Sequence, residues 1–182
     1  MHDNLTQILN DPDKNKIMPK VYDELMVMAR AALRRNRRYD TLDTSAVVHE
    51  SVIKFYGSQA HHFKSRGHFY ALMSKIMREL IIDYARSKNA QIRGGGLEKV
   101  TLSGLGASDD KLEVDVSHVL DMDKAMTELA EFDKILEQMM IMKFYGGLKI
   151  SELAQCFNTS ESSIKRDIRT ARAFMKSRLK DY

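Results

Sequence analysis

Apolar residues recur at helical spacing along most of the chain. The clearest case is residues 69–88, where they follow the i, i+3, i+4, i+7 pattern of one buried helix face. Shorter patterns of the same kind predict helices over residues 17–36 and 44–57, the second capped by Asp43 or Thr44. No segment of the sequence shows the alternating pattern of a strand. The pattern therefore predicts an all-α protein.

The second half of the chain predicts three further helices. Apolar positions between Val119 and Tyr145 fit one amphipathic helix, which a glycine pair would end. A short helix over residues 150–157 and a long one over residues 161–180 follow, separated by the residues Asn-Thr-Ser. This spacing of a short helix, a tight turn and a long helix is typical of a helix-turn-helix.

Residues 94–118 differ from the rest of the chain. They hold five of the nine glycines, three of them consecutive, and they lack a helical apolar period. We expect a flexible linker here. The predicted organisation is therefore two small helical domains, 1–93 and 119–182, joined by the linker 94–118.

Composition excludes several classes of protein. Cys156 is the only cysteine, so no internal disulfide can form, and its isolation is typical of a reducing cytoplasm. No apolar run approaches the roughly 20 residues of a membrane helix, so we expect no membrane contact. Zinc-ligand spacing, a phosphate-binding loop and an assignable catalytic arrangement are all missing from the sequence. We expect no enzymatic activity, no metal and no cofactor, and a cytoplasmic location.

Charge is unevenly distributed around the formal net value of +4. Residues 1–93 contain 16 Lys/Arg and 10 Asp/Glu, whereas residues 94–118 contain 2 and 5. The predicted helix 161–180 alone has 7 basic and 2 acidic residues. Two basic regions on one chain indicate contact with a polyanion at two places, although an ordinary solvated surface explains the charge equally well.

The segment 149–172 has the local features that a helix-turn-helix needs. Ala154 is small enough for the helix crossing, Asn158 tolerates the positive φ of a tight turn, and Ser160 can cap the second helix. The expected packing residues are Ile150, Leu153, Phe157, Ile164 and Ile168. The expected DNA-binding residues of the second helix are Ser162, Ser163, Lys165, Arg166, Arg169 and Arg172. The alternative is a plain helical hairpin with a solvated basic face, but size, turn, cap and charge together favour DNA binding.

Aromatic residues and cations alternate near residues 57–68. Such a mixture suits single-stranded nucleic acid, because bases stack on rings and phosphates pair with cations. The alternative, which the sequence slightly favours, is that Phe69 and Tyr70 belong to the core and that the histidines are merely exposed.

Three segments, in order, resemble one known family. They run from Asp43 to Phe55 (DTSAVVHESVIKF), from Phe69 to Arg86 (FYALMSKIMRELIIDYAR) and from Phe144 to Arg172. Together they are similar to the core-docking helix, the promoter-melting helix and the terminal promoter-reading motif of bacterial RNA polymerase sigma factors. The resemblance is to the minimal, extracytoplasmic-function (ECF) type, and it spans about residues 20–180 apart from the linker.

The resemblance implies roles for these segments. Residues 43–55 would dock on the clamp helices of the largest polymerase subunit. Residues 57–88 would open and hold the minus-ten element, and the second helix of the terminal motif would read the minus-thirty-five element. The implied polymerase-binding residues are Asp43, Val47, His49 and Glu50, and Lys75 and Arg78 join the DNA-binding set. The expected partners are core RNA polymerase and promoter DNA, together with an anti-sigma factor or a Ser/Thr kinase as regulator.

Two other functions compete with this interpretation. One is a two-domain helix-turn-helix repressor or activator that never engages polymerase as a sigma factor. The other is a small nucleic-acid-processing enzyme, which the missing catalytic pattern disfavours. Binding to core polymerase would separate the first of these from a sigma factor.

The docking helix departs from the family pattern at its start. Ser45 and Ala46 replace the family's acidic pair. Thr41, Thr44 and Ser45 surround this gap, and a phosphate on one of them would add about −1.5 to −2 charge at a helix N-terminus. We therefore hypothesise that a Ser/Thr kinase activates the protein. The alternative is that these hydroxyls only cap the helix, and that Asp43 and Glu50 suffice for docking.

Overall fold

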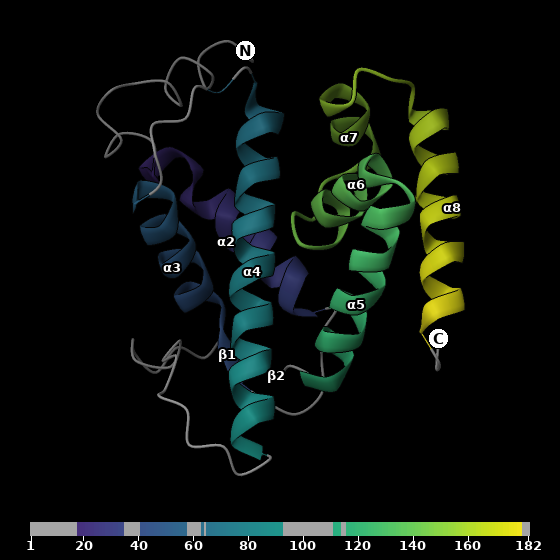
Figure 1. Ribbon diagram of the computed structural model, residues 1–182. Helices are drawn as coiled ribbons and strands as arrows, with labels where there is room; N and C mark the ends of the chain where they lie inside the picture. The colour runs from purple at the N-terminus through teal and green to yellow at the C-terminus, as the bar shows by residue number, and fades with distance from the viewer. Residues whose placement is uncertain are drawn as a thin grey trace.

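The computed structural model describes residues 18–34, 41–57, 63, 65–92, 111–113 and 116–179. The elements in chain order are α2 (Met18–Arg34), β1 (Thr41–Asp43), α3 (Thr44–Gly57), α4 (Arg66–Ile92), β2 (Lys111–Glu113), α5 (Val116–Phe132), α6 (Lys134–Phe144), α7 (Ile150–Cys156) and α8 (Glu161–Arg178). The long helix α4 lies centrally, with α3 on one side, α5 to α8 on the other, and α2 crossing behind it (Figure 1). The predicted all-α class is confirmed.

Helices α2, α3 and α4 form the N-terminal unit. The apolar face of α2 is buried, and Val21, Leu25 and Leu33 are fully inaccessible. They pack with the apolar faces of α3 and α4, as their helical spacing predicts. Observed α4 extends beyond the predicted 69–88 at both ends.

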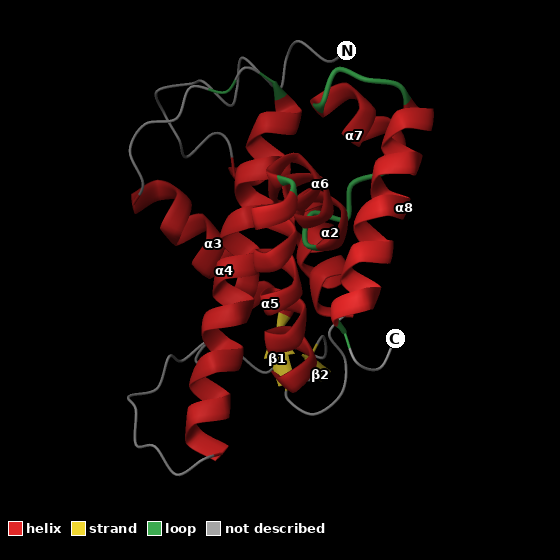
Figure 2. Ribbon diagram, turned by 45° about the vertical axis from the view of Figure 1, so that its right-hand side comes forward, coloured by secondary structure: helices red, strands yellow, loops and turns green. Residues whose placement is uncertain are grey.

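A two-stranded antiparallel ladder joins distant parts of the chain. Thr41 of β1 pairs with Glu113 of β2, and Asp43 pairs with Lys111 (Figure 2). Three residues are too few to show an alternating pattern, so no pattern in the sequence marks this ladder. The ladder ties the start of α3 to the last part of the predicted linker. Residues 93–110 and 114–115 of that region lie outside the described residues.

Helices α5 to α8 form the C-terminal unit. The sequence predicted one helix up to Tyr145, and that prediction was wrong, because α5 and α6 are separate helices that meet at Asp133. Asp133 has an extended backbone (φ −155°, ψ 108°), and its carboxylate accepts hydrogen bonds from the N–H groups of Ile135 and Leu136. An N-cap of this kind starts a new helix and allows the chain to change direction.

Helices α7 and α8 follow each other as predicted. Asn158 has a φ of +49°, as expected for the turn between them. The hydroxyl of Ser160 accepts the N–H of Ser163 at 3.1 Å, which confirms its predicted role as the cap of α8. Helix α8 is held to α5 by stacking of Phe132 on Phe174 and by an ion pair between Arg178 and Glu128.

The two units share one continuous apolar core. Helix α4 packs along α5, α6 and α7, so the N-terminal and C-terminal units meet over much of its length (Figure 2). Glycines allow the closest approaches. A Cβ added to Gly146 would overlap the hydroxyl of Ser74, and one added to Gly67 would overlap the thiol of Cys156. None of the described helices is both long and apolar enough to cross a membrane.

Candidate nucleic-acid and polymerase interfaces

Helix α8 presents an exposed basic face to solvent. Five of its six predicted DNA-binding residues are exposed, and the sixth, Ser163, is half-buried. The full set is Ser162, Ser163, Lys165, Arg166, Arg169 and Arg172. The opposite face of the helix, with Ile164 and Ile168, is buried against α5 and α6. Helix α8 lies at the outer edge of the molecule (Figure 1). The structure therefore brings this predicted set together on one accessible surface.

The start of α8 is fixed by local chemistry. Ser160 satisfies the N–H of Ser163, and Glu161 places a negative charge in the first turn, where the helix dipole favours it. Glu161 also lies 4.0 Å from the ammonium group of Lys165, but both side chains are more than half exposed, so this pair adds little stability. The predicted DNA-binding cations of α8 therefore remain available to a polyanion.

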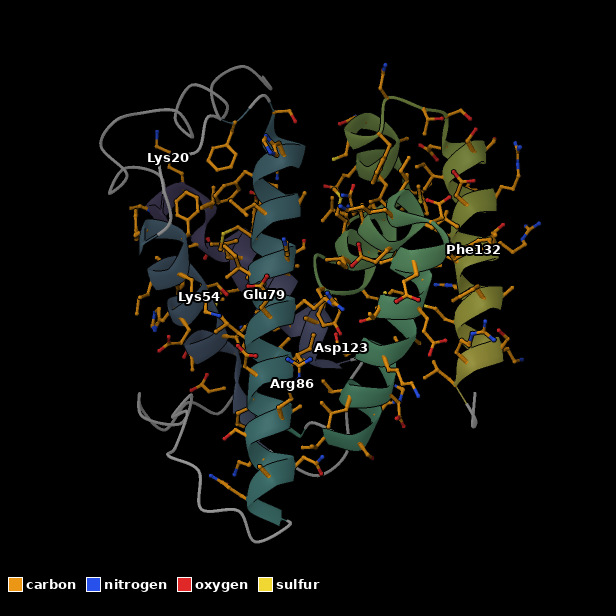
Figure 3. All side chains as sticks on the ribbon, viewed as in Figure 1. Lys20, Lys54, Glu79, Arg86, Asp123 and Phe132 are labelled. Carbon is orange, nitrogen blue, oxygen red and sulfur yellow. The ribbon has the colours of Figure 1, made fainter. Side chains whose placement is uncertain are left out.

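The predicted DNA-binding residues of α4 are placed differently. Lys75 is exposed, whereas the side chain of Arg78 is only 14% exposed. The guanidinium of Arg78 donates to Asp123 of α5 at 2.6 Å and lies 3.7 Å from the carboxylate of Glu137 of α6. The other oxygen of Asp123 accepts from Arg86 at 3.0 Å, and Figure 3 shows Arg86 and Asp123 between α4 and α5. Arg78, Arg86, Asp123 and Glu137 thus form one charged cluster between the units, here called the interunit cluster.

Burial raises the pKa of one carboxyl group in this cluster and of a phenol beside it. Burial raises the pKa of Glu137 above its ordinary value, although Arg78, Lys75 and Lys134 oppose the rise. Burial also raises the pKa of the neighbouring Tyr145 to about 12, so its phenol stays protonated. The Nε of Arg78 is buried and has no hydrogen-bond partner among the described residues. The cluster is therefore formed at a cost, because a buried donor without a partner is unfavourable.

Part of the predicted polymerase-binding set at the docking helix α3 is buried. The carboxylate of Asp43 is buried and accepts both the N–H and the hydroxyl of Ser45, at 2.8 and 2.9 Å. Val47 is fully buried in the core. His49 is exposed, with its ring beside Tyr22, and Glu50 is half-buried. The accessible part of the predicted set is therefore His49 and Glu50.

The aromatic residues around the start of α4 belong to the core. Phe69 and Tyr70 are buried and His68 is exposed, which confirms for these three residues the interpretation that the sequence favoured. Phe63 is also buried, and it stacks on Phe55 with ring centroids 6.0 Å apart. His61 and His62 lie outside the described residues. In the part of the chain that the structure describes, no group of three or more His, Cys, Asp or Glu residues could hold a metal ion.

Sequence reasoning missed the acidic half of the interunit cluster. Asp123 and Glu137 lie on different helices and look like ordinary solvated residues of amphipathic segments. Their pairing with Arg78 depends on how α5 and α6 are placed against α4. No periodicity or motif in the sequence marks that contact.

Comparison with known proteins identifies the family of the chain. A family model described as ECF sigma factor matches residues 3–181, almost the full chain. No curated protein and no solved structure matches the chain significantly. The family match covers both units and the segment between them.

Proposed function

Because the chain belongs to the ECF sigma factor family, we propose that it directs core RNA polymerase to its promoters through two DNA-contacting helices, α8 and α4. The observation that carries this proposal is the exposed basic face of α8, set behind a tight turn and backed by a buried apolar face. The family match disfavours a repressor or activator that never engages polymerase. It also disfavours an enzyme, because sigma factors act in transcription initiation.

Helix α8 is suited to reading duplex DNA. A recognition helix places its first residues at base edges in the major groove and its later cations at phosphates. Ser162, Lys165 and Arg166 occupy the first two turns of α8 and are exposed. We assign this helix to the minus-thirty-five element. Arg169 and Arg172, further along, would contact phosphate groups.

Helix α4 is the proposed contact for the opened minus-ten element. Lys75, Arg78 and Arg86 place three positive charges on its polar side. Helix α3, next to it, would dock on polymerase through its exposed residues. The roles of α3 and α4 rest on family membership, since in this conformation Arg78 is occupied by acidic side chains.

Transcription with purified components tests the proposed function. Core polymerase and a promoter library are mixed with the protein, and transcripts are sequenced from their 5′ ends. We expect a set of start sites that requires the protein and shares two sequence elements. The double variant Arg166→Ala/Arg169→Ala should lose the upstream element first. A transcript profile identical to that of core polymerase alone would contradict the proposal.

A finer proposal concerns control by phosphorylation. Thr44 is fully buried and the side chain of Thr41 is not described, whereas Ser45 is half-buried. We therefore propose Ser45 as the modified residue. A phosphate there would remove the hydroxyl hydrogen bond to Asp43 and place two charges close to its carboxylate. Repulsion between them would loosen the start of α3 and expose negative charge there. An anti-sigma factor stays an alternative regulator that the sequence predicted.

Site-specific phosphoserine tests this control. The chain is made with phosphoserine at position 45, with phosphothreonine at position 44 or 41, or, as a control, with phosphoserine at the exposed position 177. Binding to core polymerase is measured for each protein and for Ser45→Ala. We expect tighter binding only for phosphate at position 45. Equal affinity of the unmodified and Ser45-phosphorylated proteins would contradict the kinase proposal, while leaving the sigma function intact.

A further inference from the structure

The C-terminal unit covers one cation of α4 and pairs with a second: the side chain of Arg78 is 14% exposed, whereas that of Arg86 is 62% exposed. Asp123 joins two cations that are eight residues apart on α4, with one carboxylate oxygen on Arg78 and the other on Arg86. Glu137 approaches Arg78 from α6. Arginine side chains bind phosphate and carboxylate oxygens with the same geometry, so these two acids occupy positions that phosphate groups of DNA would take.

This covering is part of a close fit rather than a single ion pair. At one end of the contact, Gly67 of α4 lies against Cys156 of α7, with no room for a Cβ. Near the middle, Ser74 of α4 lies against Gly146, again with no room for a side chain. The interunit cluster lies further along α4. Contacts of this kind at three places along α4 fix the C-terminal unit on the helix.

We infer that this is an autoinhibited conformation, in which Asp123 and Glu137 imitate DNA phosphates and hold Arg78 and Arg86 until the C-terminal unit moves away. The inference rests on the proposed role of α4 in promoter binding. Opening would release both arginines and leave α8 unchanged, because α8 moves with α5 and α6. The covered and open forms therefore differ in their affinity for single-stranded DNA rather than for duplex DNA.

Two buried polar groups make the closed conformation less stable. The Nε of Arg78 is buried without a partner among the described residues, and burial raises the pKa of Glu137, so both groups oppose closure. A minor form a few kcal/mol away is populated at about 0.1–10%. Apparent affinity for a ligand of the open form falls by that same fraction. Binding to polymerase or DNA could then supply the energy that opening requires.

Removing the charge of Asp123 tests directly whether its contact with Arg78 and Arg86 inhibits DNA binding. Affinity for a fluorescein-labelled single-stranded oligonucleotide is measured by anisotropy, and the radius of gyration by small-angle X-ray scattering. Asp123→Asn should increase affinity by roughly 10-fold or more and expand the protein. Asp121→Asn removes the same charge from an exposed position of the same helix and should change neither quantity. Equal affinity of the two variants would overturn the inference.

A reversible lock provides the second test. A Cβ at position 67 would lie 3.4 Å from the Cβ of Cys156, close to the mean of about 3.8 Å for disulfides. Gly67→Cys therefore creates a pair that diamide can oxidise and dithiothreitol can reduce, with no other cysteine in the chain. The oxidised protein should fail to bind the oligonucleotide, and the reduced protein should bind more tightly than the natural sequence, because the added side chain pushes α4 from α7.

The control for the lock is Gly67→Cys/Cys156→Ser, which cannot form the disulfide and should be indifferent to diamide. Equal oligonucleotide affinity in the oxidised and reduced states of the lock would overturn the inference. The absence of polymerase-dependent transcription in both states would contradict the proposed function instead. Oligonucleotide binding by the free protein decides autoinhibition independently of polymerase.

Discussion

Helices α8 and α4 carry the two predicted DNA-contacting surfaces, and the structure treats them in opposite ways. The predicted DNA-binding cations of α8 are exposed, and Glu161, which lies 4.0 Å from Lys165, is itself exposed. On α4, Arg78 is 14% exposed and meets two carboxylates, while Arg86 is paired with one of them. A basic helix face in a sequence therefore predicts positive charge, but it does not predict whether that charge is accessible to a ligand. Availability depends on what packs against the helix.

The two surfaces also differ in energetic role. The predicted DNA-binding cations of α8 contribute little to stability, because exposed ion pairs are largely screened by water. The charges of α4 are partly withdrawn from water and depend on their partners. Removing one partner of a buried pair leaves the other uncompensated, which is strongly unfavourable. Substitutions on α4 should therefore affect folding, and those on α8 should affect DNA binding.

The largest expected effect is on stability at α4. Arg78→Ala leaves Glu137 buried without its nearest cation, and we expect the free energy of unfolding to fall by about 3 kcal/mol. Urea unfolding followed by circular dichroism measures the loss. Arg166→Ala on α8 is the matched control, with an expected change within about 0.5 kcal/mol. Equal losses for the two variants would show that the interunit cluster does not hold the protein together.

The next effect is on duplex binding at α8. Arg166→Ala or Arg169→Ala should weaken binding to the promoter duplex by about 1–3 kcal/mol. If the lost contact is to a base, sequence preference should relax at one position; if it is to a phosphate, affinity should fall evenly and the salt dependence should flatten. Fluorescence anisotropy at several salt concentrations separates the two cases. Wild-type affinity of the double variant would remove α8 from the interface.

A smaller effect is expected at the junction between α5 and α6. Asp133 accepts the N–H groups of Ile135 and Leu136, and Asp133→Ala should cost about 1 kcal/mol of stability. Asp133→Asn retains an acceptor oxygen and should recover most of the loss. Because α6 carries Glu137, a looser junction should also raise single-strand affinity. Thermal unfolding and anisotropy measure the two outcomes, and a fully stable Asp133→Ala protein would contradict the role of the cap.

The smallest expected effect is a pH dependence due to Glu137. Its pKa is raised in the folded protein because burial disfavours the charged form, against opposing attraction from Arg78, Lys75 and Lys134. The folded state then binds this proton more tightly than the unfolded state, so its contribution to stability falls as pH rises above the ordinary value of 4.5 through the raised pKa.

The variant Glu137→Gln lacks this titration. Urea unfolding of both proteins at a series of pH values gives the difference between them. The natural protein should lose stability relative to Glu137→Gln as the pH rises from about 4 to 7. A gain over that range would mean that attraction to Arg78 outweighs burial.

Local features of the fold could be predicted from the sequence, because local physics determines them. The buried face of α2, the positive φ of Asn158 and the cap by Ser160 depend on residue type and spacing within a few positions. The break at Asp133 was missed because an Asp within an apolar period can be either a solvated helix residue or a cap. Packing decides between them.

Features that depend on distant contacts could not be predicted. The pairing of β1 with β2 joins residues about 70 positions apart, and Arg78 is 45 positions from Asp123. Neither contact has a local signal. The interunit cluster needs three helices in place before its charges meet. The sequence therefore names Lys75 and Arg78 of α4 as candidate site residues but does not name the acidic partners of Arg78.

The central claim is that Arg78 of α4 is covered by the C-terminal unit in the free protein and uncovered on polymerase. It is tested most directly by distances between spin labels on Glu79→Cys of α4 and Ala173→Cys of α8, both at exposed positions, in a Cys156→Ser background. A label pair on Glu131→Cys and Ala173→Cys, within the C-terminal unit, serves as the control. The account predicts one distance in the free protein, a longer one with core polymerase, and no change in the control pair. An α4–α8 distance that stays the same on binding polymerase would contradict it.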